Sequence, residues 1–412
     1  MNKKAQIIFL NQSSGPLFRE LVTNAAAKIG PVIFLNSDAL VPDQPYIKMI
    51  QAPLHNNTSP FSRIKSWISY LIITSWHLAF CPGKPLLFIA TNPPIMPLIG
   101  WMMRVLKKQR YVLLYYDIYP EALIRFGGLS EGALLTKLWR LMNRIAIRSA
   151  DLVVTISDRM AETLSQYFPK REPFSNLLVI PTWVDTGWIK PISFESNPFA
   201  QRYARPDNLI VLYSGNLGAV HDLSMLPGMA ERLSQYPRIR FLIVSSSPRR
   251  IDLEVQCQDL KLDNVVFLPQ QPEEYLPQVL AAGDIGIVSL AAGAEGISMP
   301  SKTYYMMAAG NALLGISSPN SELDRLIGEH KCGINIFPDN VDDAVKTILH
   351  WYENRDALFQ AKQRSRGAAQ THFDKGVLIP KVLSELSRLI ALESLDVPAS
   401  LGEKDSLSPG IF

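Results

Sequence analysis

The ten residues 209–218, LIVLYSGNLG, decide the fold class of this chain. Six uncharged residues ending at Ser214 have the length and composition of a buried strand, and a turn with two glycines follows them. We expect a helix to begin near Asp222. A strand that leads through such a turn into a helix is typical of parallel sheets covered by helices on both faces. The backbone N–H groups of the turn could bind phosphate oxygens, or the glycines could serve only to tighten the turn.

The same alternation of apolar runs and helix-like stretches continues in both directions along the chain. An irregular stretch rich in Pro, Ser and Asn, residues 183–200, separates two series of runs. The sequence therefore predicts an α/β protein of two doubly wound, Rossmann-like domains that face a cleft. The predicted strands are 5–10, 31–35, 46–50, 85–90, 110–116, 151–156 and 177–181 in the first series, and 209–214, 240–245, 264–268, 284–289, 312–316 and 333–336 in the second.

The domain boundaries follow from this pattern. We expect an N-terminal domain at residues 1–185, a linker at 186–200 and a C-terminal domain at 201–372. Residues 373–393 carry apolar side chains on one side of a helical pattern, which predicts a helix that packs back on the N-terminal domain. The polar residues 394–412 predict a flexible tail.

The composition is that of a globular chain with an uneven distribution of charge. The 412 residues are 47% hydrophobic and 19% charged, which is ordinary for two or three domains. Residues 1–190 contain 21 Lys and Arg against 11 Asp and Glu, and the remainder contains 20 against 26, for a net charge of +4. Three widely separated cysteines and a start without a cleavage site predict a cytoplasmic protein without disulfides. Neither the cysteines nor the six histidines have metal-ligand spacing, so no metal site is expected.

A second loop with the features of an anion site lies at residues 295–302, EGISMPSK. It follows the strand that ends at Ser289 and precedes an apolar helix. Ser301 at the start of that helix, beside Lys302, would bind an anion and would face the first loop if both line one cleft. One diphosphate held between the two loops explains both features. The alternative is that Lys302 is an ordinary solvated surface charge.

A longer series of motifs resembles a known family. The series is TNPP at 91–94, DIYPE at 117–121, DLVVTIS at 151–157, IPTWVD at 180–185, VFLPQ at 266–270, YLP at 275–277, LAAGDIGIV at 280–288, Glu295, PSK at 300–302 and AAG at 308–310. In this order and spacing the motifs resemble the family-four, retaining glycosyltransferases of the GT-B fold. The resemblance is to the WbuB-like branch, which acts on bacterial surface polysaccharides, and it spans about residues 5–390.

The resemblance implies a nucleotide-sugar donor site in the C-terminal domain and an acceptor site in the N-terminal domain. Glu295 would lie near the transferred sugar, and Tyr305 stands where the family has a ribose-binding glutamate. Asn216 and His221 stand where many relatives have Arg and Lys. The donor-binding residues implied are Gly215, Asn216, Arg249, Pro269, Gln270, Ser301, Lys302 and Tyr305, and the acceptor-binding residues are Gly15, Asn92 and Glu121.

Asp117 is the second candidate for catalysis beside Glu295. It follows an uncharged run at the edge of the sheet where ligands bind. Its carboxylate could polarise the acceptor hydroxyl, or it could cap the helix that begins at Pro120. The chain has no Asp-x-Asp after a central strand, so we expect no essential metal ion and no cofactor other than the co-substrate, a UDP or GDP sugar.

The basic first half predicts contact with an anionic membrane surface. Residues 66–81 contain no formal charge, and Lys137, Arg140, Arg144 and Arg148 form a basic stripe at helical spacing. These patterns predict a peripheral enzyme at the inner face of the cytoplasmic membrane, whose glycan acceptor is linked to a polyprenyl diphosphate. A buried core helix and a solvated basic face are the alternatives. No recognition motif for nucleic acid accompanies the basic residues.

Two other classes of function are compatible with the same patterns. Nucleotide-sugar epimerases can share the two-domain fold. A non-catalytic nucleotide-sugar-binding partner would explain Tyr305 and the missing bases of the first loop. The acceptor-side motifs and Lys302 favour a transferase.

Overall fold

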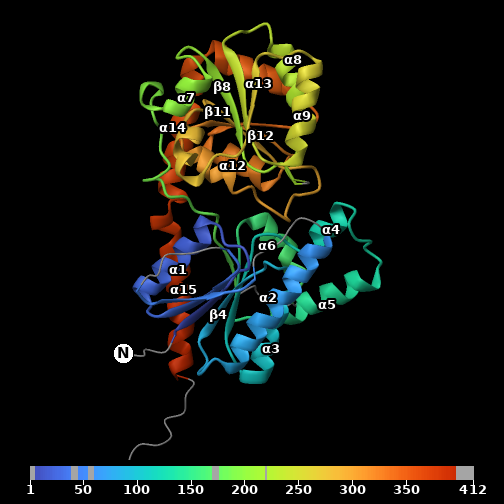
Figure 1. Ribbon diagram of the computed structural model, residues 1–412, viewed down its shortest axis with the longest axis vertical. Helices are drawn as coiled ribbons and strands as arrows, with labels where there is room; N and C mark the ends of the chain where they lie inside the picture. Colours follow the sequence, from blue (N-terminus) through green and yellow to red (C-terminus); the bar gives the residue numbers. More distant parts are fainter. Residues whose placement is uncertain (1–4, 39–44, 54–59, 169–175, 219, 396–412) are drawn as a thin grey trace, which may run out of the picture.

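The computed structural model describes residues 5–38, 45–53, 60–168, 176–218 and 220–395, which form two α/β domains (Figure 1). Each domain is built on a parallel sheet. The strand order is β3-β2-β1-β4-β5-β6-β7 in the N-terminal sheet and β10-β9-β8-β11-β12-β13 in the C-terminal sheet. This architecture confirms the predicted fold of two doubly wound domains.

The N-terminal domain alternates strands and helices as the sequence predicts. Its strands begin and end within two residues of the predicted positions, because uncharged apolar runs are stable only in a sheet covered on both faces. The strands are β1 (Ile7–Leu10), β2 (Val32–Asn36), β3 (Ile47–Gln51), β4 (Leu86–Ala90), β5 (Tyr111–Tyr115), β6 (Leu152–Thr155) and β7 (Leu177–Val179). The helices are α1 (Pro16–Lys28), α2 (Pro60–Phe80), α3 (Pro97–Lys107), α4 (Glu121–Arg125), α5 (Leu134–Ser149) and α6 (Asp158–Ser165).

The C-terminal domain repeats the pattern after a connection that contains η1 (Phe194–Ser196) and α7 (Pro198–Tyr203). Its strands are β8 (Leu209–Ser214), β9 (Ile239–Val244), β10 (Val265–Leu268), β11 (Ile285–Ser289), β12 (Ala312–Ile316) and β13 (Gly333–Ile336). Its helical elements are α8 (Leu226–Leu233), α9 (Pro248–Asp259), η2 (Glu273–Tyr275), α10 (Leu276–Ala281), α11 (Lys302–Ala308), α12 (Glu322–His330), α13 (Val341–Glu353) and α14 (Arg355–His372), and α15 (Lys375–Leu395) follows.

The helix after β8 begins later than the sequence indicated. It begins at Leu226 rather than near Asp222, and Pro227 occupies its first turn. Proline is favourable there because its fixed φ suits the first helical position and it lacks an N–H group that would go unpaired. Asp222 instead accepts a hydrogen bond from the backbone N–H of Ser224 at 2.9 Å. The loop after β8 is therefore longer, and it carries His221 into the space between the domains.

Helices cover both faces of the N-terminal sheet. One face packs against α1 and α15, and the other against α2, α3 and α5 (Figure 1). α15 follows the last helix of the C-terminal domain, and it runs along the N-terminal domain with Ile379, Leu383 and Leu386 buried. Each such side chain contributes roughly 1.5–3 kcal/mol when it is fully buried. The helix α15 therefore contributes to the hydrophobic core of the N-terminal domain.

The chain passes between the domains twice at one place. The N–H of Val184 donates to the carbonyl of Phe373 and the N–H of Lys375 donates to the carbonyl of Val184, both at 2.9 Å. Asp374 accepts hydrogen bonds from the backbone and side chain of Thr186. The start of the linker and the start of α15 are thus fixed to each other where the chain crosses between the domains.

One side of the N-terminal domain leaves apolar side chains in solvent. On α2, Tyr70 and Leu78 are buried, while Ile68 and Trp76 on the opposite face are exposed. On α5 the exposed side chains are Leu134, Leu135, Leu138, Leu141 and Ile145. One side of the uncharged stretch at 66–81 therefore packs in the core, and the other side is apolar and exposed to solvent. None of the described helices combines the length and apolar character that crossing a membrane requires.

The four bases of the expected stripe lie on α5, where Arg148 is exposed, and two of the four also make contacts within the domain. Arg140 donates to Glu121 at 3.1 Å and to Glu131 at 3.2 Å. Arg148 donates to the carbonyl of Tyr167 at 3.2 Å. Lys137 and Arg144 are exposed. Two of the four bases therefore hold α5 against its own domain, because neighbouring loops present oxygen atoms to them.

Candidate active site

A cavity of about 400 Å³ lies between the two domains at the carboxyl ends of their strands. The N-terminal domain contributes Gly15, Asn92 and Asp117 to its walls, and the C-terminal domain contributes Ser301 and Tyr305. Ligands of doubly wound sheets bind outside the carboxyl ends of the strands. The two domains thus bring predicted donor and acceptor residues to one space.

Asp117 is held by the opposite domain. It follows β5 and forms an isolated antiparallel bridge with Ser298, while the N–H of the next residue, Ile118, donates to the carbonyl of Ile297 at 3.2 Å. Burial raises the pKa of the Asp117 carboxyl, and a hydrogen bond with the Ser298 side chain opposes the rise. The helix after it has Pro120 at its N-cap position without a side-chain cap, so Asp117 does not serve as the cap. Its carboxylate lines the cavity instead.

Lys302 is a partly buried cation next to Ser301, which lines the cavity. Its Nζ atom donates to the hydroxyl of Tyr213 at 2.6 Å and lies 4.0 Å from the centroid of the Tyr213 ring. Burial lowers the pKa of Lys302 to about 7. The alternative of a solvated surface charge is therefore wrong. A phenol is a weak partner for a cation, so an anionic ligand at this place would stabilise the charged form of Lys302.

Gly215 allows the first glycine-rich loop to approach Lys302. Its φ is +145°, a conformation that residues with a side chain rarely adopt. A Cβ atom there would lie 3.2 Å from the Nζ of Lys302. The carbonyl of Asn216 accepts a hydrogen bond from the Tyr213 hydroxyl at 2.9 Å, so the same phenol joins this loop to Lys302. The two loops expected to hold one anion therefore meet.

His221 was not among the residues expected to bind the donor, although it lines the cavity. Its Nδ1 atom lies 3.0 Å from the carbonyl oxygen of Ser289. Burial and the nearby Lys302 lower the pKa of His221 to about 4. The ring is neutral at pH 7, Nδ1 carries its proton, and Nε2 remains an acceptor for a ligand hydroxyl. The sequence signal that could have identified His221 is its alignment with a basic position of relatives. The conformation of the loop determines that its ring lines the cavity.

The remaining donor-side predictions lie along the loops after β8, β9 and β10. Arg249 donates to the carbonyl of Gly218 at 3.1 Å. Gln270, which follows Pro269, donates from its backbone N–H to the hydroxyl of Ser246 at 2.9 Å. These hydrogen bonds connect three successive loops at the ligand edge of the sheet, and none of these residues lines the cavity itself.

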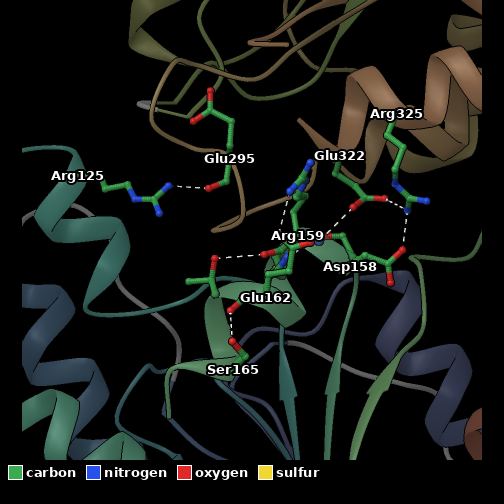
Figure 2. A network of polar contacts seen from close by, with 11 residues as sticks. Arg125, Asp158, Arg159, Glu162, Ser165, Glu295, Glu322 and Arg325 are labelled. Atoms are coloured by element: carbon green, nitrogen blue, oxygen red, sulfur yellow. Dashed lines mark hydrogen bonds and ion pairs between the residues drawn. The ribbon is translucent and has the colours of Figure 1, made fainter. Parts of the chain in front are cut away.

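Glu295 lies in the loop that reaches across to the N-terminal domain. Its side chain accepts a hydrogen bond from the N–H of Gly293 at 2.8 Å, and its carbonyl accepts one from Arg125 at 2.6 Å. Figure 2 shows its carboxylate directed away from Arg125. The side chain does not line the cavity, whereas Ser298 in the same loop does. A direct role near the transferred sugar stays a prediction.

Glu121 is not brought to the cavity. It is buried, and its Oε1 atom accepts hydrogen bonds from Tyr167 at 2.7 Å and Arg140 at 3.1 Å. This carboxylate fixes α5 and the end of α6 to the loop that begins at Asp117. Any contribution of Glu121 to acceptor binding is therefore through the position of that loop.

A network of polar contacts joins the two domains (Figure 2). Arg325 of α12 pairs with Asp158 of α6 at 2.8 Å and also with Glu322. The buried Glu322 accepts a hydrogen bond from the backbone N–H of Arg159 at 3.3 Å. A Cβ atom on Gly296 would come within 2.9 Å of the carbonyl of Arg159. The domains thus meet too closely at this point for any larger residue.

The arrangement supplies a cation for an anionic ligand and a carboxylate for a hydroxyl group. Lys302 is suited to bind a diphosphate, and Gly215 leaves room for it by carrying no side chain. Asp117 is suited to polarise or deprotonate a hydroxyl across the cavity. Within the described parts of the chain, no three side chains of the metal-binding types gather closely enough to hold an ion.

Comparison with known proteins identifies relatives of both domains. Residues 196–369 match the family model described as Glycosyl transferases group 1. The chain is 26% identical over 255 residues to WbjE of Pseudomonas aeruginosa, which is named as a glycosyltransferase, with coverage of 61% of this chain and 62% of WbjE. It is 27% identical over 313 residues to WcaI of Escherichia coli (strain K12), named as a colanic acid biosynthesis glycosyl transferase, with coverage of 74% of each. The chain therefore spans about three fifths of the length of WbjE.

Solved structures share the fold at low identity. Sucrose-phosphate synthase from Thermosynechococcus elongatus superposes with a TM-score of 0.74 and 17% identity, covering 95% of this chain and 100% of that one. HepE from Anabaena, in complex with UDP and glucose, gives a TM-score of 0.68 and 16% identity, covering 94% and 98%. These structures confirm the two-domain fold. The family match and the two relatives agree with the transferase class that the sequence predicts.

Proposed function

We propose that this chain is a glycosyltransferase that moves a sugar from a nucleoside-diphosphate sugar to a glycan acceptor in the biosynthesis of cell-surface polysaccharide or lipopolysaccharide. The observation that carries the proposal is one cavity whose wall contains Asp117 of the N-terminal domain and Ser301 of the C-terminal domain, with the partly buried Lys302 next to Ser301 and beside a glycine-rich loop. The names of WbjE and WcaI support the class of reaction. The chain resembles the retaining, WbuB-like branch of the family.

The donor diphosphate would bind between the two loops of the C-terminal domain. Lys302 would neutralise the charge that builds up on the departing nucleoside diphosphate, and Asn216 and Ser301 would add N–H and hydroxyl donors. Gly215, whose own N–H donates to the carbonyl of Val244, would let the loop approach the diphosphate closely. UDP or GDP is the nucleotide we propose, and the UDP bound to HepE supports the first. With Lys302 in this role the reaction needs no metal ion.

The nucleoside would lie beyond these loops. Pro269 and Gln270 follow β10 at the edge of the same sheet and would hold the base, with Arg249 close to the phosphate loop. Tyr305 lines the cavity and would contact the ribose through its hydroxyl. Burial raises the pKa of Tyr305, so the phenol is a neutral hydrogen-bond donor at pH 7.

The acceptor would bind against the N-terminal domain. Asp117 would polarise the attacking hydroxyl, with Asn92 and Gly15 in the same wall of the cavity. A retaining reaction requires the acceptor oxygen to approach from the side on which the nucleoside diphosphate departs. The closed contact between Asp117 and Ser298 supports such an approach, because it places the acceptor loop next to the donor loop.

We propose that the protein is peripherally attached to the inner face of the cytoplasmic membrane and that its acceptor is linked to a lipid. The exposed apolar faces of α2 and α5 support it. So does the charge around them, because the 72 residues 45–116 contain no Asp or Glu and eight Lys and Arg.

The test is a thermal-unfolding panel of nucleoside diphosphates and nucleotide sugars with wild type and Lys302→Met. We expect one diphosphate and its sugars to raise the unfolding temperature, because a ligand of the native state stabilises it by mass action. Lys302→Met should lose most of that rise. Lys346→Met, which removes an exposed lysine of the same domain, is the matched control and should keep it. No rise with any nucleotide would contradict the proposal.

The pH dependence of UDP affinity is a second readout of the same experiment. In the free protein the pKa of Lys302 is about 7, and a bound diphosphate would raise it. The affinity should therefore be highest below pH 7 and fall as the pH rises above it, by up to about tenfold per unit. Lys302→Met keeps the titration of the nucleotide itself, so the difference between the two proteins isolates the lysine.

A further inference from the structure

The exposed apolar faces of α2 and α5 enclose a groove. The groove has a volume of about 310 Å³, within the range of about 300–1,000 Å³ that ligand sites occupy. Its walls are apolar throughout and include Trp67, Ile68, Leu71, Leu138 and Trp139. Ile68 and Leu138 remain half exposed. Apolar side chains gathered in this way mark a place where an apolar ligand or partner binds.

The charged side chains on the helices around the groove are all basic. The sequences of α2, α3 and α5 contain no carboxylate, and exposed bases include Arg63, Lys65, Lys137 and Arg144. An apolar slot within a basic surface complements a ligand with a hydrocarbon chain and an anionic head. A protein partner with an apolar face would require no such excess of bases.

Neighbouring residues of one segment line the groove and the cavity of the active site. Pro94 and Ile95 line the groove, while Asn92, two residues earlier, lines the cavity. The ring of Trp139 stacks on that of Tyr119 with centroids 6.2 Å apart, and Tyr119 lies two residues after Asp117. A ligand that occupies the groove therefore has its nearer end close to the acceptor wall.

Arg63 lies beside the groove, at the ring of Trp67. Its guanidinium is 5.4 Å from the ring centroid of Trp67 in the groove. Burial raises the pKa of Tyr119, Asp117 adds to the rise, and Arg63 opposes it, so the fields of both charges reach this phenol. The order of neighbours is thus groove, Trp139, Tyr119 and Asp117, with Arg63 beside Trp67 at the groove.

From this order we infer that the groove binds the hydrocarbon chain of a prenyl-diphosphate-linked acceptor, with Arg63 at the diphosphate and the acceptor sugar at Asp117. The inference rests on the proposed function and names the class of its acceptor. The hydrocarbon chain of the acceptor would then lie in the groove and not among the lipids of the bilayer. The length of the groove would determine how far the acceptor sugar reaches into the cavity.

The experiment measures binding of farnesyl diphosphate, below its micelle concentration, to protein saturated with UDP so that the donor site is occupied. Calorimetry gives the affinity, and Trp67 and Trp139 give a fluorescence change from within the groove. We expect Leu138→Glu to weaken binding at least tenfold, because a carboxylate would enter the apolar slot. Val105→Glu adds the same group to an exposed apolar position of α3 outside the groove and should change the affinity less than twofold.

A second pair of variants tests the head-group position. Arg63→Gln should weaken farnesyl diphosphate several-fold and leave farnesol unchanged. Lys65→Gln, an exposed base on the same helix, should leave both unchanged. The unfolding temperatures of all four variants should match wild type, since each side chain is exposed.

Three results of the farnesyl diphosphate measurements would overturn the inference. They are an absence of farnesyl diphosphate binding, its displacement by inorganic diphosphate alone, and equal effects of Leu138→Glu and Val105→Glu. A fourth result comes from binding to anionic vesicles. If Leu138→Glu and Val105→Glu weaken vesicle binding equally while farnesyl diphosphate binding is unchanged, the face is a general membrane contact and the inference fails. Failure of the proposed function has a different signature, because it would appear as absence of nucleotide binding in the thermal panel.

Discussion

At the scale of single residues, the site depends on two side chains whose ionisation is set by distant parts of the chain. Lys302 is beside Tyr213, which is 89 residues away in sequence, and has no carboxylate as its hydrogen-bond partner. Asp117 is partly enclosed by the loop that contains Ser298. A cation and a carboxylate with perturbed pKa values at one cavity are typical of a functional site.

Replacement of Asp117 by Asn should separate binding from catalysis. The amide has the same shape but cannot accept a proton, so we expect the turnover number to fall about 100-fold, in the range typical of a lost acid or base. The affinity for UDP should not change. Transfer to acceptor, measured under saturating donor, is the readout, and wild-type turnover in this variant would remove Asp117 from the mechanism.

Ser298→Ala is the matched variant for the environment of that carboxylate. The Ser298 hydroxyl lowers the pKa of Asp117, so its loss should raise the pKa further. If the ionised carboxylate is the active form, the acidic limb of the pH–rate profile should move to higher pH. A profile identical to wild type would count against this link.

At the scale of elements, the turn after β8 shows how a local conformation makes room for a side chain of another element. Gly215 has a positive φ, and the side chain of Lys302 from α11 fills the space that a Cβ atom would need. The basic helix α5 shows the opposite case, since Arg140 is drawn into its own domain by Glu121. Local sequence thus determines an element, and its neighbours determine what its side chains do.

Gly215→Ala should therefore displace Lys302. Strain at this φ and the contact at 3.2 Å together cost about 1–3 kcal/mol, so we expect UDP affinity to fall about tenfold. Gly218→Ala, in the same loop, is the control because a Cβ there meets no atom within 4 Å. Titration calorimetry measures the UDP affinity of the two variants. Equal affinities would show that UDP binding does not require the space beside Lys302.

At the scale of the whole molecule, the two halves of the site exist only when the domains are closed. The contacts are the bridge between Asp117 and Ser298, the bond from Ile118 to Ile297 and the network of Arg325 with Asp158. Gly296 lies at the closest approach, and a Cβ atom there would be 2.7 Å from the hydroxyl of Thr163. Donor and acceptor residues are thus aligned by the interface and not by either domain alone.

Gly296→Ala should hold the domains apart. We expect a larger radius of gyration in solution scattering, a fall in kcat/KM of at least tenfold, and unchanged UDP affinity. Gly293→Ala is the control, because its φ is also positive but a Cβ there meets nothing within 4 Å. Equal behaviour of the two variants would indicate that backbone strain, and not domain closure, is responsible.

The sequence by itself determined the two domains, the order of their strands along the chain and the loops that carry the site. The reason is that apolar periodicity and turn residues are local properties, and parallel strands place their carboxyl ends at one edge. The tertiary structure alone decided that Lys302 is desolvated, that Glu121 is buried away from the cavity, that His221 enters it, and which faces of α2 and α5 remain exposed. These properties depend on which surfaces meet across long sequence separations, and hydrophobic periodicity records only that a residue is apolar, not what covers it.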